Sequence, residues 1–284
     1  MFDLAALDAA LAGTAFAGKL HFMPVTDSTN TDALAAARSG APHGSVWFAD
    51  EQRAGRGRGD HAWHSAAGEG LYASVLLRPQ FPVLRLPLLP LVAGLAAADA
   101  IRAVTGLAAD LRWPNDLLIG PRKAGGILVE AKTEGGGVAF AVVGIGINVH
   151  QRSFARDLAT PATSLDLEAE RRVSRQDLLV SLLKSLEQET LGLLDPLVGE
   201  TILRRVEAAS TWVRGRRVEV HGPQACTGVT AGLDGNGFLL VQAADGLVTV
   251  RTGGIRDDRI PPFAKSAKGG APAEGRAPDD LEMS

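Results

Sequence analysis

Two arginines set between glycines, in Ala54-Gly-Arg-Gly-Arg-Gly59, form a segment that could bind an anion. The glycines let the backbone wrap closely around a small ligand, and the guanidinium groups of Arg56 and Arg58 match a phosphate or a carboxylate. A solvated loop or a weak RNA-binding patch would have the same composition. The segment therefore indicates an anion site, with a plain loop as the alternative.

A second polar segment, Pro-Asn-Asp at 114–116, follows Arg112-Trp113. Pro114 should end a strand, so that Asn115 and Asp116 present polar side chains at its end. Asp116 could serve Mg²⁺ or a ribose hydroxyl. In a plain turn, the same three residues would need no function.

Glycines accompany the two remaining segments. Lys123 precedes Gly125-Gly126, so its ammonium would stand beside backbone that a ligand can approach, although an exposed lysine is more often only a solvated charge. Residues 144–148, Gly-Ile-Gly-Ile-Asn, clear one face of a strand, and the amide of Asn148 could read a purine edge. Such glycines also mark bulges or tight packing, and the segment is not the dinucleotide fingerprint G-x-G-x-x-G.

Taken in order, these segments resemble the biotin protein ligase family. The family pattern starts with Ser-Thr-Asn, continues with E-Q-x-A-G-R-G-R, Trp-Pro-Asn-Asp and Arg-Lys-x-x-Gly-Ile-Leu-x-Glu, and ends with Gly-x-Gly-Ile-Asn. This chain has the corresponding segments at 27–30, 51–58, 113–116, 122–130 and 144–148. The resemblance is strong over residues 20–150. The end of the chain resembles, more weakly, the small SH3-like module of this family.

The resemblance implies a ligase reaction in two steps. The carboxylate of biotin attacks the α-phosphate of ATP, giving biotinyl-5'-AMP and pyrophosphate, and a lysine of a biotin carboxyl carrier protein then attacks the mixed anhydride. The first step brings two anions together, which is repulsive by several kcal/mol in a partly buried site. Cations must offset this repulsion. We expect Lys123, Arg56 and Arg58 to be catalytic, with Mg²⁺ on the triphosphate.

The binding residues are carried over from the family, and no residue is assigned as a metal ligand. The ureido ring of biotin needs matched polar groups in an otherwise apolar pocket. The residues implied for biotin are Ser28, Thr29, Asn30, Gln52, Arg56, Gly57, Arg58, Lys123, Gly125 and Gly126. The residues implied for ATP are Arg58, Trp63, Trp113, Asn115, Asp116, Lys123 and Asn148.

The chain departs from the family pattern in two ways. Asp60-His61 stands where the family has a second Gly-Arg before the tryptophan, which costs one positive charge. Many bacterial members carry a DNA-binding helix-turn-helix ahead of Ser-Thr-Asn, but here that motif begins at Ser28, which leaves too little chain for such a domain. We therefore expect no nucleic-acid partner. A lipoate protein ligase of the same fold and a non-catalytic, biotin-sensing regulator are the alternatives.

The elements expected to position these residues form an α+β fold. We predict helices over 28–39, 84–105 and 174–193, and strands over 44–50, 71–79, 111–116, 125–133 and 138–149. By resemblance, residues 15–205 form a class II synthetase-like catalytic domain, a mixed sheet with flanking helices. Over 212–260, short strands separated by DGNG and Asp-Gly turns predict a small β-barrel, SH3-like by resemblance. Residues 262–284 are predicted to be a disordered tail.

The cysteine count and the apolar segments indicate in which compartment the protein works and which partners it has. Cys226 is the one cysteine, which excludes an internal disulfide, and residues 1–13 lack the basic start of a signal peptide. The apolar stretch 86–98 contains two prolines and is shorter than the about 20 residues that a membrane span needs. We therefore expect a cytoplasmic protein with no membrane partner, for which a homodimer remains open.

Overall fold

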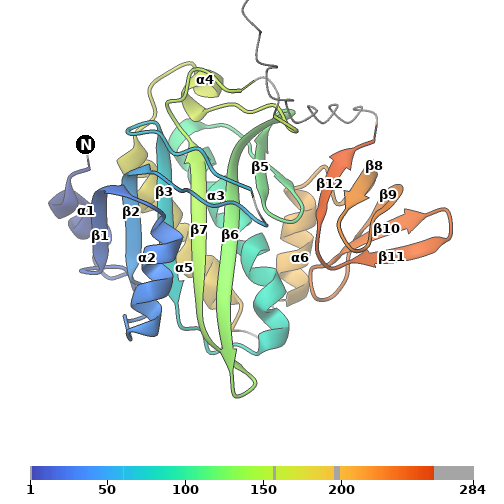
Figure 1. Ribbon diagram of the computed structural model, residues 1–284, viewed down its shortest axis with the longest axis horizontal. Coiled ribbons are helices and arrows are strands. Elements are labelled where there is room, and N and C mark those ends of the chain that lie inside the picture. The colour runs from blue at the N-terminus through green and yellow to red at the C-terminus, as the bar shows by residue number, and fades with distance from the viewer. Residues whose placement is uncertain (1, 60, 156–157, 195–198, 259–284) are drawn as a thin grey trace, which may run out of the picture.

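The computed structural model describes residues 2–59, 61–155, 158–194 and 199–258 (Figure 1). Asp60 and the predicted tail over 262–284 lie outside the described residues. The described chain contains a large mixed sheet flanked by helices and a smaller antiparallel sheet near the C-terminal end. The expected fold class is therefore confirmed.

A seven-stranded sheet organises the larger part of the chain, in the order β1-β2-β3-β7-β6-β5-β4. The pair β1–β2 is parallel, and the other described pairs of this sheet are antiparallel. The strands are β1 (Leu20–Thr26), β2 (Val46–Gln52), β3 (Gly70–Leu77), β4 (Asp110–Arg112), β5 (Asp116–Ile119), β6 (Arg122–Glu134) and β7 (Gly137–Asn148).

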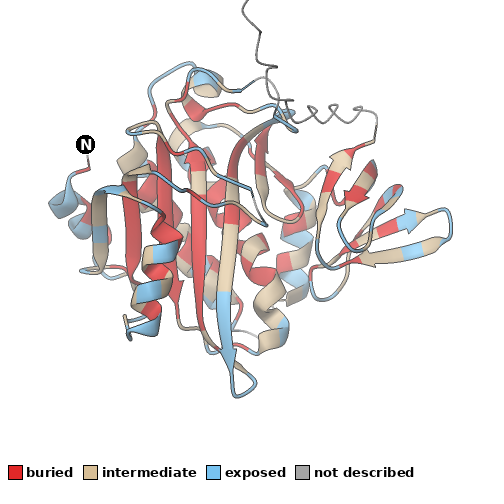
Figure 2. Ribbon diagram, viewed as in Figure 1, coloured by how far each residue is buried: buried red, intermediate tan, exposed pale blue. Residues whose placement is uncertain are grey.

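Helices cover both faces of this sheet. Figure 1 shows α2 (Thr29–Arg38) in front of the sheet, with α3 (Leu89–Thr105) and α5 (Arg175–Gly192) behind it. The central strands β3 and β7 therefore consist mostly of buried residues (Figure 2), and all of β3 is buried. The shorter helices are α1 (Leu4–Ala10), η1 (Val83–Leu88), α4 (Leu165–Ala169) and α6 (Gly199–Ala208).

The apolar helix behind the sheet matches the helix predicted over 84–105 and extends beyond the stretch 86–98 on both sides. Val83–Thr105 covers 23 residues with a hydropathy of 1.6, enough in length and composition to cross a membrane. The expectation that this stretch is too short is therefore wrong. Proline is tolerated in a first helical turn, so Pro90 lets α3 begin at Leu89 instead of breaking it. Buried residues make up 67% of the most apolar window, as in a core helix.

The smaller sheet has five antiparallel strands in the order β11-β10-β9-β8-β12. They are β8 (Arg214–His221), β9 (Cys226–Leu233), β10 (Leu239–Ala243), β11 (Gly246–Val250) and β12 (Gly254–Asp257). Short strands were expected over this part of the chain. The sheet contacts the larger part of the chain through Trp113, whose indole Nε1 donates to the Gly237 carbonyl at 3.1 Å.

The largest departure from the predicted elements lies at 111–119. One strand was expected over 111–116, but the chain reverses after β4 and returns as β5, with Arg112 opposite Asp116. Pro114 has no N–H to continue a ladder, so it lies in the turn. The structure also adds α1, β1 and α6. Leu7 of α1 is fully buried in the main core, ahead of residue 15, and the domain boundaries stay predictions.

Candidate functional site

One face of strands β5, β6 and β7 carries most of the predicted chemistry. Gly126 on β6 lies opposite Asp116 on β5 and opposite Gly146 on β7. Because side chains alternate along a strand, Glu130 lies on the same face as Gly126. We call this surface the glycine face. It is the side of the sheet on which α2 packs.

A β-bulge brings Lys123 onto the glycine face. Lys123 is three residues before Gly126 and would point away from it in a regular strand. Leu117 pairs with Gly125 and Leu118 pairs with Lys123, so Ala124 is an extra residue in β6. As a result, a Cβ built on Gly126 would lie only 3.6 Å from Lys123 Nζ.

Asp116 joins two cations on this face. The Lys123 ammonium lies 2.5 Å from Asp116 Oδ1, and the Arg112 guanidinium binds Oδ2 at 2.6 and 3.1 Å. Burial would raise the pKa of the Asp116 carboxyl, but the charges and hydrogen bonds of Lys123 and Arg112 lower that pKa below its ordinary value. Asp116 is therefore ionised near neutral pH and holds Lys123 in place.

The arginine loop, residues 53–59, lies across the glycine face. Arg56 forms an ion pair with Glu130, and Arg58 donates to the carbonyl of Gly253, just before β12. Burial lowers the pKa of the Arg58 guanidinium, while the charge of Asp116 acts in the opposite direction. Both predicted arginines therefore have internal partners, one on the seven-stranded sheet and one beside the smaller sheet.

The loop returns through Trp63, whose ring lies on the glycine face. A Cβ on Gly146 would come within 2.6 Å of the Trp63 indole, and one on Gly126 within 3.4 Å. Lys123 Nζ lies 5.5 Å from the ring centroid. Among the described residues, the buried Nε1 of Trp63 has no hydrogen-bond acceptor. An unmet buried donor costs free energy, so this N–H is available to a ligand.

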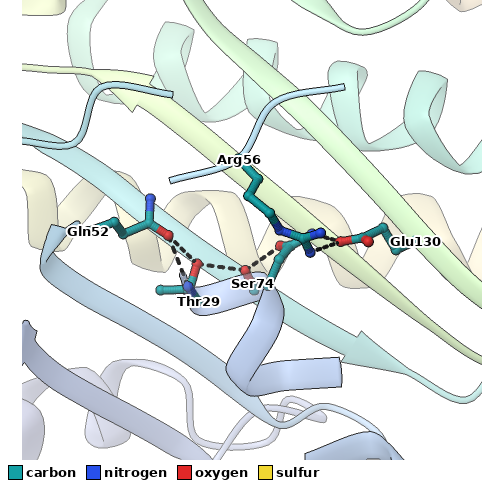
Figure 3. A network of polar contacts seen from close by, with 6 residues as sticks. Thr29, Gln52, Arg56, Ser74 and Glu130 are labelled. Carbon is teal, nitrogen blue, oxygen red and sulfur yellow. Dashed lines mark hydrogen bonds and ion pairs between the residues drawn. The ribbon is translucent and has the colours of Figure 1, made fainter. Parts of the chain in front are cut away.

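Polar side chains from α2, β2 and β3 meet at the edge of this face (Figure 3). Gln52 Oε1 accepts from the Thr29 backbone N–H at 2.9 Å and the Thr29 hydroxyl at 3.1 Å. The Ser74 hydroxyl lies 2.7 Å from Thr29 Oγ1 and 2.6 Å from Asn30 Oδ1. Ser28 is the N-cap of α2 by position but makes no side-chain cap bond, and Gln52 satisfies the N–H of Thr29, the first helical residue.

Two further predicted glycines make close approaches. Gly57 donates its N–H to the His61 carbonyl at 2.7 Å, which closes the turn of the loop. A Cβ on Gly125 would lie 2.9 Å from both the Gly146 carbonyl and the Leu117 side chain. Gly57 and Gly125 therefore allow the backbone to fold as it does, and their predicted contacts with biotin stay predictions.

Three residues that were predicted to bind ATP donate hydrogen bonds to backbone carbonyls of the protein. Trp113 bonds to Gly237, as described above, and Asn115 Nδ2 donates to the Ile127 carbonyl at 2.7 Å. Asn148 Nδ2 donates to the Thr163 carbonyl at 3.0 Å. These bonds fix the walls around Asp116 and Lys123, while the contacts of these side chains with ATP stay predictions.

The structure thus brings Arg56, Lys123 and Trp63 onto one face with Asp116. Sequence reasoning missed Glu130, Arg112 and Ser74. Glu130 could have been found, because its even spacing from Gly126 puts both residues on one face of a strand. Among the described residues, no group of three or more histidine, cysteine or acidic side chains could hold a metal ion.

A family model described as the biotin/lipoate A/B protein ligase family matches residues 22–148. The bifunctional ligase/repressor BirA of Escherichia coli K12 is 31% identical over 241 residues, covering 84% of this chain and 73% of that protein. The biotin–[acetyl-CoA-carboxylase] ligase of Mycobacterium tuberculosis is 32% identical over 243 residues, covering 84% of this chain and 88% of that protein.

The match to other relatives covers less of their length, and the likeness in fold extends over most of the chain. The BirA proteins of two Bacillus species are 38–39% identical, but the matched part spans only 53% of their length. Among solved structures, the biotin protein ligase from Aquifex aeolicus in complex with biotin and ATP aligns with a TM-score of 0.73 and 29% identity. That alignment covers 84% of this chain and 98% of the Aquifex chain.

Proposed function

The chain belongs to the biotin protein ligase family, and from this premise we propose that it forms biotinyl-5'-AMP from biotin and ATP. It then transfers biotin to a lysine of a biotin carboxyl carrier protein. The observation that carries the proposal is the glycine face, where Lys123, held at 2.5 Å by ionised Asp116, lies beside Gly126 and under the Trp63 ring. The buried Nε1–H of that ring has no acceptor among the described residues.

Lys123 and Arg56 supply the charge that the first step needs. The biotin carboxylate and the α-phosphate must meet as anions, and fixed cations in a partly buried site offset their repulsion. Lys123 is held by Asp116 and Arg56 by Glu130. Each cation is therefore positioned before the ligand arrives, and the incoming anions share it with the resident carboxylate.

The polar cluster around Thr29 and Gln52 supports a ureido site. It combines hydroxyl, amide and backbone groups at the edge of the glycine face. Groups of this kind can match the two N–H donors and the carbonyl of biotin, whose burial would otherwise cost affinity. We assign the ureido ring to this end and the carboxylate to the Lys123 end.

The cofactor, the partners and the compartment belong to the same proposal. Both carboxylate oxygens of Asp116 are engaged by Lys123 and Arg112. We therefore assign Mg²⁺ to the triphosphate of ATP. We propose a cytoplasmic enzyme that acts on a carrier protein, without a nucleic-acid or membrane partner, with a homodimer left open.

Incubation with labelled biotin, ATP and a biotin carrier domain tests the proposal. We expect label on the carrier only when ATP is present, and none on a carrier whose acceptor lysine is replaced by arginine. Lipoate in place of biotin serves as the matched alternative substrate. Transfer of lipoate but not biotin would refute the proposed substrate, and pyrophosphate release without any transfer would refute the second step.

A further inference from the structure

A carboxylate that the sequence left without a role links the arginine loop to α2. Glu130 Oε2 accepts from Asn30 Nδ2 at 3.0 Å and is also the partner of the Arg56 guanidinium (Figure 3). These residues come from three separate elements: the first turn of α2, strand β6 and the loop after β2. The contacts therefore determine how the loop lies against the glycine face.

The buried end of this chain of contacts is rigid. Asn30 is only 4% exposed, and its Oδ1 accepts from the Ser74 hydroxyl at 2.6 Å. A carboxylate can only accept, so the amide N–H₂ of Asn30 must face Glu130 and its oxygen must face Ser74. A Cβ on Gly144 would lie 2.0 Å from Asn30 Oδ1, so that glycine is required for this arrangement.

The outer end of this chain of contacts, at Arg56 and Glu130, is exposed to solvent. The Arg56 side chain is 41% exposed, and the side chain of Glu130 is 29% exposed. A long side chain loses conformational freedom when it is ordered, and a partner that orders it beforehand lowers that cost when a ligand binds. We propose that Glu130, anchored by Asn30, is a positioning residue that holds Arg56 on the glycine face.

The proposal rests on the proposed function for the identity of the ligand. That Glu130 orders the arginine loop does not depend on that function. It also assigns Asn30 a role within the protein: its amide has both ends engaged by Ser74 and Glu130, so it acts on the ligand through Arg56. Glu130 carries a negative charge near a site for anions. Because Glu130 and Arg56 are partly exposed, water and salt screen the repulsion between the Glu130 charge and an anionic ligand. The ordering of the Arg56 side chain by Glu130 is therefore the larger effect.

Amide hydrogen exchange of the ligand-free protein tests the hold directly. In Glu130→Ala we expect residues 53–58 to exchange about tenfold faster than in the wild type, because a charge-assisted contact is lost. Glu130→Gln keeps an acceptor for Arg56 and should fall between the two. The matched control is Glu134→Gln, which removes an exposed carboxylate paired with Lys132 on the same strand, and should leave the loop unchanged.

Calorimetric titration with biotin and, separately, with ATP tests the consequence. We expect Glu130→Ala to weaken biotin binding about tenfold and to leave ATP binding almost unchanged. In an Arg56→Ala background, the same change should add almost nothing. Unchanged loop exchange, tighter biotin binding, or a full additional loss in the Arg56→Ala background would overturn the proposal. A wild-type protein that binds no biotin would instead refute the proposed function, while the exchange experiment still decides the role of Glu130.

Discussion

Replacing Lys123 by methionine removes the ammonium and keeps a side chain of similar length. If Lys123 stabilises the group that is transferred to biotin, the variant should bind ATP but form the adenylate slowly. The loss of one charge-assisted hydrogen bond in the transition state is worth about 1.5–3 kcal/mol. At 1.36 kcal/mol for each factor of ten, this corresponds to a roughly 10- to 150-fold lower rate of pyrophosphate release.

The variant should remain folded, so the rate can be measured on intact protein. Asp116 keeps two contacts with Arg112, at 2.6 and 3.1 Å, and does not become an unpaired buried charge. We therefore expect a stability loss of only about 1–3 kcal/mol, against a typical total of about 5–15 kcal/mol. Lys132→Met removes an exposed lysine of the same strand and serves as the control.

The assay is pyrophosphate release at saturating biotin and ATP, with ATP affinity measured separately by calorimetry. Under saturation, weaker binding cannot account for a lower rate, so the comparison isolates the chemical step. A Lys123→Met rate close to that of Lys132→Met would remove Lys123 from the mechanism. A large loss of ATP affinity with a normal rate at saturation would limit Lys123 to a binding role.

Three further outcomes are expected. Arg58 fastens the arginine loop to the Gly253 carbonyl, so Arg58→Gly should still form the adenylate but release it from under the loop about 10- to 100-fold faster. The released adenylate should label serum albumin with biotin on a blot, and unlabelled albumin alongside continued synthesis would contradict this. Gly144→Ala should lower the urea-unfolding free energy by about 1–3 kcal/mol, because its Cβ would meet Asn30, whereas Gly137→Ala on the same strand has room for a Cβ and should be nearly neutral. The lowered pKa of Asp116 contributes stability that is present above about pH 4 and is lost as the pH falls through the folded-state pKa. In Asp116→Asn, the unfolding free energy from urea titrations should therefore fall less steeply with falling pH than in the wild type. Equal slopes for the two proteins would refute the lowered pKa.

The sequence predicted those helices and strands whose residues repeat at the spacing of a helix or a strand. The alternating glycines at 144 and 146 indicated a cleared strand face, and the structure shows what fills it: Asn30 lies over Gly144 and Trp63 over Gly146. The helix after Ser28 and the helix after Ser174 also begin and end close to where capping residues indicated. These features depend on neighbours within one or two turns, which a sequence displays directly.

Features that depend on distant pairing could not be predicted in the same way. Arg56 pairs with Glu130, 74 positions along the chain, and only the sheet and loop together bring them into contact. Strand β1 was missed because, at the sheet edge and with Pro24 inside it, its burial does not alternate. In contrast, Ile202 and Val206 of α6 are buried at helical spacing, so that helix was accessible to pattern reasoning.

The bulge in β6 has a consequence for residues that never meet a ligand. Ala124 is fully buried in the main core, and a Cβ added to Gly125, directly after it, would lie 2.9 Å from the Leu117 side chain. These two consecutive residues are therefore both small and both enclosed by the protein. A larger residue at 124 would overpack the core and displace the strand, moving the attached Lys123 away from Asp116. The volume of an apolar side chain on the far side of the sheet thus determines where the ammonium stands.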